Sequence, residues 1–466
     1  MTVLPGGLRV CVESVPQYGR GLAAVALTVA AGGDDDPAGR HGTAHLVEHL
    51  MFPRSGREGS ADPAGEGYAA LVAGAGGVCN AETHRDHTVF HTTVPAELLP
   101  DALAWEAGRL LGFAPTEDVI RTETDVIGEE IRGAGDAGRY WESALGALYP
   151  GSRDSFGTQA ELAGITAGEV EAFFRAHYTA PRMVLSVVGD VDPARVMAVV
   201  REVFAGVVRT AEETRAAEAP RTAREIRAAE APRTAEQARV AGAVRTAEET
   251  RAAEAPRAAR ETRAAEAPRT ATEIRTAPLP AARPGVAVGH PLPDPVAERP
   301  AYLAQAVLAQ VLGRSRLPAL ARSARDGHRL TSATVTCGYH GQWLASAAPD
   351  LTLAVLGRAP GTEVGAAVDI WRSVLRAVAD GPLPEAEHRR AVNSLLVAWH
   401  RQADSLPTRA VALGRDALLL PGSAGPDALP AELRRTTPAE VAAAARALLE
   451  GPVTVTELAP QKGTVG

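Results

Sequence analysis

Apolar positions in the first 208 residues follow two different periods. Stretches that alternate or run apolar over a few residues are typical of strands, and they lie at residues 8–12, 22–30, 88–94 and 183–188. Longer stretches with apolar residues three and four positions apart are typical of helices, and they lie around His45 and at residues 95–111, 116–132 and 166–177. Strands and helices are therefore mixed in this part of the chain.

Residues 281–466 show the same kind of pattern. Strands are predicted at residues 285–289, 332–337, 351–355 and 453–458, and helices at 301–312, 361–379, 383–404 and 437–449. The two segments resemble each other in outline. The sequence therefore predicts an α+β fold of two similar α/β-sandwich halves, each a mostly antiparallel sheet with helices.

Between these segments, residues 209–280 consist of six units of 12 residues, beginning with RTAEETRAAEAP. The 14 Arg and 12 Glu of these 72 residues nearly balance, and proline ends most units, which interrupts any long helix. No unit has an apolar face to bury against its neighbours. We therefore expect a disordered or transiently helical linker between domains 1–208 and 281–466; a spacer or docking arm is the functional alternative.

Composition and net charge argue against several classes of protein. The net charge of −8 argues against a general nucleic-acid binder, and no uncharged apolar stretch of about 18 residues suggests a membrane span. The start of the chain lacks the pattern of a secretory signal. The three cysteines, Cys11, Cys79 and Cys337, do not form a disulfide framework and fit a reducing compartment, so we expect a cytoplasmic protein.

The strongest chemical signal is H-x-x-E-H at residues 45–49. On a helix, His45 and His49 would share one face, one turn apart, and could bind one Zn²⁺. Glu48 would lie on the same side and could take a proton from a water there. This is the inverted form of the H-E-x-x-H zinc-protease motif.

A catalytic zinc site also needs a third protein ligand from another element. The predicted helix at residues 116–132 offers Glu123, Asp125, Glu129 and Glu130. Glu123 and Glu130 are seven positions apart and share a helical face, whereas Glu129 points about 100° away. The spacing favours Glu130 as the ligand and Glu123 as its support, and a solvated acidic face is the alternative.

Further stretches match one known family. They are residues 8–10, 76–83 with the pattern G-G-x-x-N-A-x-T, 86–90, 126–131, 156–158 and 183–191. With these, residues 1–208 resemble the M16 metallopeptidases, the pitrilysin group that includes insulinase and mitochondrial processing peptidase, most of all their short bacterial members. The resemblance is looser over residues 281–466.

The resemblance implies a role for several residues. His45, His49 and Glu130 would bind Zn²⁺, Glu48 would be the general base, and Glu123 would support it. Asn80 and Ala81 would lie on a strand edge that pairs with a peptide substrate. The function implied is a zinc metalloendopeptidase that cleaves unstructured peptides or leader segments.

One departure from the family concerns an Arg and a Tyr that help to hold the substrate in the second half or in a partner. Arg322 or Arg325 could supply the Arg, but Tyr339 follows too late in the sequence. We therefore expect the zinc subunit of a clamshell-shaped dimer, with a second family subunit supplying the Arg/Tyr pair; the alternatives are a homodimer or a site that depends less on the Tyr. The alternative function is a non-catalytic structural subunit.

Other histidines need no metal. His84, His87 and His91 flank a predicted strand, where an offset of three places side chains on opposite faces. His41 is four residues before His45 but is expected to precede the helix. We therefore predict a single metal site.

Overall fold

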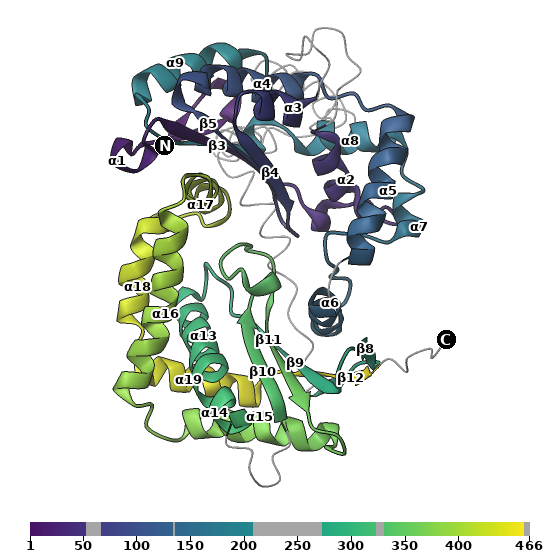
Figure 1. The fold of residues 1–466 in the computed structure, drawn as a ribbon, viewed down its shortest axis with the longest axis vertical. Helices are drawn as coiled ribbons and strands as arrows, with labels where there is room; N and C mark the ends of the chain where they lie inside the picture. The colour runs from purple at the N-terminus through teal and green to yellow at the C-terminus, as the bar shows by residue number, and fades with distance from the viewer. Residues whose placement is uncertain (53–66, 134–135, 208–272, 323–329, 461–466) are drawn as a thin grey trace, which may run out of the picture.

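The computed structural model describes residues 1–52, 67–133, 136–207, 273–322 and 330–460, which form two similar halves (Figure 1). The predicted repeats lie outside the described residues except for residues 273–280. Each half has a sheet covered by helices, so the predicted α+β fold of two similar halves is confirmed. Among the described residues, no helix combines the length and the apolar character needed to cross a membrane.

The first sheet has six strands. In spatial order they are β1 (Thr2–Val3), β2 (Arg9–Ser14), β6 (Met183–Gly189), β3 (Leu22–Val29), β5 (Thr88–Pro95) and β4 (Val78–Thr83). Only β2 and β6 pair in parallel; the other neighbours are antiparallel. Strand β4 therefore forms the outer edge of this sheet.

The second sheet repeats this topology. Its strands, in spatial order, are β10 (Leu330–Cys337), β11 (Leu351–Arg358), β9 (Gly285–Pro291), β12 (Thr454–Pro460) and β7 (Ile274–Arg275), with β8 (Leu279–Ala281) also paired to β12. Strands β7, β9, β10, β11 and β12 correspond in order to β2, β3, β4, β5 and β6, down to the parallel pairing of the first and last. The halves are thus alike in connectivity as well as in composition.

The sheets bury both faces. Along β3, Val25 and Leu27 point into one core and Ala24 and Ala26 into another, as the alternation of side chains in a strand requires. The first-half helices are α1 (Pro16–Gly19), α2 (Thr43–Leu50), α3 (Tyr68–Gly74), α4 (Leu99–Leu111), α5 (Glu117–Gly133), α6 (Asp136–Leu148), α7 (Gln159–Leu162), α8 (Ala167–His177) and α9 (Pro193–Val203). All strands predicted in this half, and the helices corresponding to α2, α4, α5 and α8, are present within a few residues of their expected bounds.

The second-half helices are α13 (Arg299–Val311), α14 (Leu317–Arg322), α15 (Val364–Ala379), α16 (Glu385–Ala403), α17 (Leu406–Leu419), α18 (Leu429–Arg435) and α19 (Pro438–Glu450). The predictions for α13, α15, α16 and α19 are confirmed. Eight helices within the described ranges were not predicted from the sequence: α1, α3, α6, α7, α9, α14, α17 and α18.

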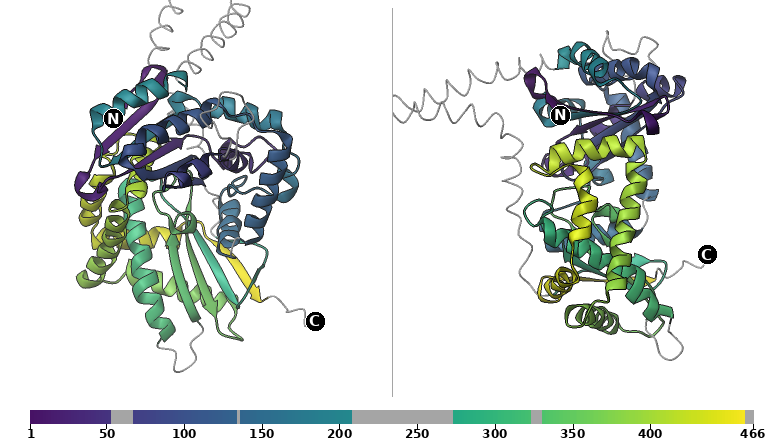
Figure 2. Two further views of the ribbon diagram at one scale, coloured as in Figure 1. Left: turned by 45° about the horizontal axis from the view of Figure 1, so that its top comes forward. Right: turned by 90° about the vertical axis from the view of Figure 1, so that its left-hand side faces the viewer.

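Two of the helices missed by the sequence analysis are exchanged between the halves. Helix α17 of the second half packs on β3 and β6 of the first sheet, and α6 of the first half packs on β9 and β12 of the second (Figures 1 and 2). Gly414 allows the close approach of α17, since a Cβ there would lie 2.3 Å from Thr28 Oγ1. The exchange ties the halves together through two buried apolar surfaces.

The end of the predicted linker belongs to the second sheet. Ile274 N and Thr276 N donate hydrogen bonds to Val453 O and Val455 O at 2.8 and 3.1 Å. Residues 274–281 thus contribute β7 and β8, although they fall mostly within the last repeat unit. Their backbone pairing with β12 places these residues in the second sheet.

Candidate metal centre

Helix α2 carries the H-x-x-E-H residues and begins at a tightly packed point. Gly42 precedes it with φ of 95°, and a Cβ there would lie 2.7 Å from both Leu162 and the carbonyl of Phe156. Only glycine fits such a left-handed position without strain. The helix is eight residues long and nearly all buried, so its direction depends on this packing.

The structure brings His45, His49 and Glu130 together. Nε2 of each histidine lies 3.6 Å from the same oxygen, Oε2 of Glu130 on α5. The three ligand atoms lie within 4.8 Å of one another, and they are the only such metal-binding group found among the described residues. Atoms bound to one tetrahedral zinc at about 2.0–2.1 Å lie roughly 3.3 Å apart, so this donor set fits zinc with a small adjustment.

The two histidines have different electrostatic surroundings. Burial, with a contribution from His49, lowers the pKa of His45 to about 3, which keeps the imidazole neutral as a ligand must be. Burial also lowers the pKa of His49, but its contact with Glu123 and the nearby carboxylates of Glu48 and Glu130 outweigh this and raise it.

Glu123 contacts the far side of His49. Its Oε2 lies 3.2 Å from Nδ1 of His49, while Nε2 of the same ring faces Glu130. Two acidic candidates of α5 remain: Asp125 is exposed, and Glu129 pairs with Arg132 at 2.6 Å on the exposed side of the helix. The geometry therefore separates the acidic residues of α5 in the way that their spacing suggested.

Glu48 is buried beside this group and is 8% exposed. Thr83 of β4 donates a hydrogen bond to Glu48 Oε2. Burial raises the pKa of Glu48 to about 7, and the Thr83 hydrogen bond opposes that shift. A carboxyl group with a pKa near neutrality can both accept and release a proton.

Asn80 and Ala81 lie on β4, the outer strand of the first sheet. Ala81 packs against the core and Asn80 is on the opposite face, paired across the ladder with His91. No strand in the described part of the chain pairs with the other side of β4.

The candidates in the second half are not gathered at this site. Arg322 ends α14, and Arg325 lies outside the described residues. Tyr339 packs against Trp141, with ring centroids 4.6 Å apart, and its backbone N donates to Asp350. Tyr339 therefore contributes to the junction between the halves.

The role of Asp36 at the start of α2 was not predicted from the sequence. Its two carboxylate oxygens accept hydrogen bonds from Gly42 N and Ala44 N, both at 2.7 Å, and so cap α2. His41 Nδ1 lies 3.0 Å from Asp36, and its Nε2 lies 3.7 Å from Asp154. Although burial lowers the pKa of His41, these two carboxylates raise it to about 9.

The segment that carries Asp154 also contacts a histidine of α2. Phe156, two residues after Asp154, packs edge-on against the ring of His45 at 5.1 Å. The signal in the sequence was an acidic residue, Asp36, six positions before the N-cap Gly42. The sequence alone does not show that this side chain contacts the start of α2, because the contact depends on the fold. His41 is no ligand of the group above; it belongs to this support.

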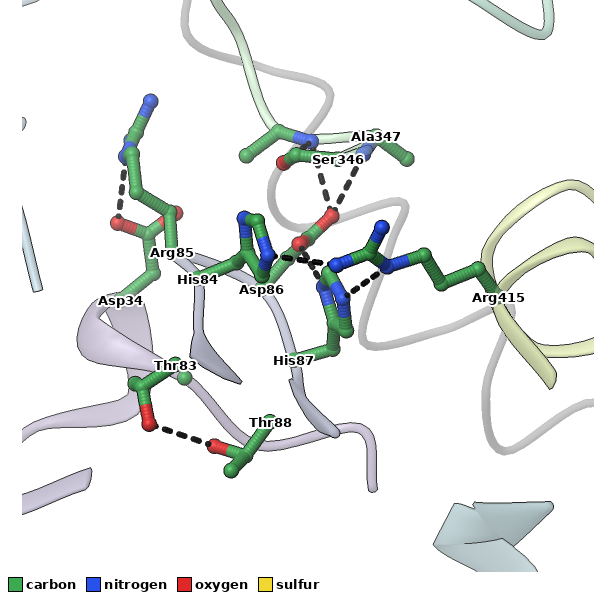
Figure 3. A network of polar contacts seen from close by, with 12 residues as sticks. Asp34, Thr83, His84, Arg85, Asp86, His87, Thr88, Ser346, Ala347 and Arg415 are labelled. Carbon is green, nitrogen blue, oxygen red and sulfur yellow. Dashed lines mark hydrogen bonds and ion pairs between the residues drawn. The ribbon is translucent and has the colours of Figure 1, made fainter. Parts of the chain in front are cut away.

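His84, His87 and His91 also form no metal-binding group with one another or with other described residues. The rings of His84 and His87 stack at 4.5 Å, and both contact Arg415 of α17 (Figure 3). The prediction that His84 and His87 lie on opposite faces of a strand is wrong, because residues 84–87 form the turn between β4 and β5 and bring the two rings together.

Two sequence models of one family match the chain. The model for insulinase (peptidase family M16) matches residues 12–134, and the model for the peptidase M16 inactive domain matches residues 164–395. The first covers the candidate metal centre. The second covers parts of both halves.

Several curated proteins are similar to the chain over about 210 residues. An uncharacterized zinc protease of Mycobacterium leprae is 33% identical over 208 residues, covering 44% of this chain and 45% of that protein. A probable mitochondrial-processing peptidase subunit beta of Arabidopsis thaliana is 29% identical over 211 residues, covering 44% and 38%. The chain thus matches less than half the length of these relatives.

Solved structures share the fold over nearly the whole chain. A protease from Helicobacter pylori has a TM-score of 0.73 at 16% identity and covers 98% of both chains. An M16-like peptidase from Alicyclobacillus acidocaldarius has a TM-score of 0.66 at 17% identity and covers 99% of this chain and 97% of that one. The two-half architecture is therefore shared.

Proposed function

The chain belongs to the M16 peptidase family, and on that premise we propose that it is a zinc-dependent endopeptidase acting on unstructured peptides or leader segments. The observation that carries the proposal is the shared approach of His45 Nε2 and His49 Nε2 to one oxygen of Glu130, beside the buried Glu48. A solvated acidic face would not bring two imidazoles and a carboxylate to one point.

In this proposal His45, His49 and Glu130 hold the metal, and zinc bound there supplies a Lewis acid that polarises the peptide carbonyl. Glu48 accepts a proton from the attacking water and then delivers it to the departing amine. Thr83 orients the Glu48 carboxylate through its hydrogen bond. Glu123 orients the His49 ring from behind.

The substrate would bind as an extended chain along the open side of β4. Backbone pairing there is independent of side-chain sequence, which suits unstructured peptides. Asn80 would add a side-chain contact, and Ala81 leaves room for the backbone. Because Tyr339 packs at the junction of the halves, we propose that a second subunit of the family supplies the Arg/Tyr pair in a dimer.

The test is hydrolysis of a quenched, unstructured peptide by the purified chain, with zinc measured on the same sample. Glu48→Gln is the control, because the amide cannot accept the proton while the three metal-binding side chains stay intact. Cleavage that disappears in Glu48→Gln, with zinc retained in both, supports the proposal.

Zinc without cleavage would require the assay to be repeated with a second family subunit. Absence of stoichiometric zinc would overturn the proposal. Cleavage that persists undiminished in Glu48→Gln would overturn the role assigned to that residue, and full activity of a monomer would overturn the dimer.

A further inference from the structure

The turn between β4 and β5, residues 84–87, is inserted into the second half. Asp86 Oδ2 accepts hydrogen bonds from the backbone N of Ala347 and Ala348 at 2.7 and 3.0 Å (Figure 3). These amides belong to the loop before β11. Asp86 is 4% exposed, so its charge is satisfied inside the junction by the backbone of the other half.

Arg415, on the exchanged helix α17, reaches the same turn. Its Nη2 lies 2.9 Å from Glu82 Oε2 and 2.7 Å from His84 Nε2, and its Nε lies 3.0 Å from His87 Nε2. A guanidinium group only donates hydrogen bonds, so Nε2 of His87 accepts here. Nε2 of His84 lies between two partners, because it is also 3.1 Å from Glu82 Oε2. On its other side, His87 Nδ1 donates to Asp86 Oδ1 at 2.9 Å.

The guanidinium group of Arg415 thus contacts three side chains at the end of β4. The Arg415 side chain is 17% exposed, and Glu82 is its ion-pair partner. Removing Arg415 would take away the ion-pair partner of Glu82 and the donor to Nε2 of His87, whose side chain is fully buried. A buried acceptor without a donor is costly, so the end of the strand would be expected to move.

This end of β4 is where the strand meets the candidate metal centre. Glu82 is held by Arg415 on one face, and the next residue, Thr83, donates to Glu48 on the other. As an edge strand, β4 has backbone pairing from β5 only. Its position therefore depends strongly on contacts made by its side chains.

We propose that Arg415 is a positioning residue for peptide binding, which fixes β4 so that its open edge is presented to the substrate. The inference rests on the proposed function. It gives the second half, which contains no H-x-x-E-H, a defined part in the site of the first. Arg415 acts through Glu82 and the 84–87 turn and need not touch the peptide.

The test compares Arg415→Gln with Arg409→Gln. Arg409 lies on the same helix, is 11% exposed, and also joins the halves, because it pairs with Glu13 of β2 at 3.0 Å and with Asp427 at 2.6 Å. It makes none of these contacts with β4. Arg409→Gln therefore reproduces the loss of an arginine on α17 that pairs with a carboxylate of the first half, without disturbing the edge strand.

Hydrogen exchange of the β4 amides is the first measurement, and it requires no activity. We expect exchange at residues 78–83 to rise about tenfold in Arg415→Gln and to stay near the parent rate in Arg409→Gln. Peptide affinity is measured by fluorescence anisotropy in the Glu48→Gln background, where Arg415→Gln should raise Kd about tenfold. In the active chain KM should rise with kcat nearly unchanged, and zinc content should stay the same.

Equal effects of the two substitutions on β4 exchange and on peptide Kd would overturn the inference and leave Arg415 a merely structural residue. If Arg415→Gln does not fold, Glu82→Ala removes the ion pair between Arg415 and Glu82 from its more exposed partner, since Glu82 is 40% exposed. Glu82→Ala is then compared with Arg409→Gln by the same measurements. A parent chain that binds no stoichiometric zinc would count against the proposed function. The exchange and anisotropy results would still decide the role of Arg415.

Discussion

Glu123 Oε2 lies 3.2 Å from Nδ1 of His49, on the side of the imidazole ring opposite the atom that faces Glu130. A carboxylate in this place fixes the tautomer and the orientation of a metal-binding histidine. The relationship links two residues that are 74 positions apart in the sequence. It gives the metal centre a support that can be tested apart from its ligands.

We expect Glu123→Gln to weaken zinc binding roughly tenfold, because the amide can still contact the ring but lacks the charge that favours the ligand tautomer. Zinc affinity is measured by competition with a chelator. Glu129→Gln is the matched control, since Glu129 pairs with exposed Arg132 on the other side of α5. Equal zinc affinities in the two variants would contradict the role of Glu123.

Asp36→Asn should also reduce zinc affinity, by about threefold to tenfold, because an asparagine cannot accept from both Gly42 N and Ala44 N with equivalent oxygens. The loss of a charged cap at the start of α2 should cost about 1 kcal/mol of stability as well. Asp192→Asn is the control, because Asp192 caps α9 in the same way, away from the metal centre. A similar loss of zinc affinity in both variants would count against Asp36.

His290 should make the protein less stable in acid. Burial lowers its pKa to about 3, and Nε2 accepts a hydrogen bond from Trp371 Nε1 at 3.0 Å, so the folded protein holds the ring neutral. The unfolded chain binds a proton near pH 6.5. The contribution of His290 to stability is therefore complete above pH 6.5 and is lost as the pH falls from 6.5 toward 3.

At pH 5 this contribution should have fallen by about 2 kcal/mol. Denaturant unfolding of His290→Gln at pH 7.5 and 5.0 measures it: the drop in unfolding free energy between the two values should be smaller than in the parent by about that amount. Exposed His400→Gln is the control. An unchanged drop in His290→Gln would show that His290 titrates normally.

The extent of the linker can be tested by two replacements with Gly/Ser segments of equal length. Replacing residues 209–272 should leave folding and activity intact, whereas replacing 209–280 removes the side chains of β7 and most of β8 beside β12. We expect the second replacement to cost at least about 1–2 kcal/mol of stability. Loss of activity in the first would show that the repeats are more than a spacer.

Local sequence patterns were sufficient for elements that carry a continuous apolar run or one regular apolar face. The apolar runs of β3 and β6 and the periodicity of α4, α8 and α19 predicted each element close to its observed bounds. The spacing of His45, Glu48 and His49 likewise required only that the segment be helical. Such patterns are local because side-chain direction repeats along a helix or a strand.

Helices α6 and α17 were missed because their character depends on a distant surface. Each packs on the sheet of the other half, and α17 includes Gly414 in its interior, which weakens a local helical signal. Gly414 is explained only by the approach of Thr28. The packing that stabilises these helices is supplied by residues hundreds of positions away.

The sequence by itself determined the two-half organisation, the H-x-x-E-H helix and the choice of α5 as the source of the third acidic group. The tertiary structure decided which side chains support that site: Asp36 caps α2, Thr83 holds Glu48, and Arg415 reaches His84 across 331 positions. Periodicity fixes the direction of a side chain within its own element, but a hydrogen bond between elements exists only when the fold has set the distance between them.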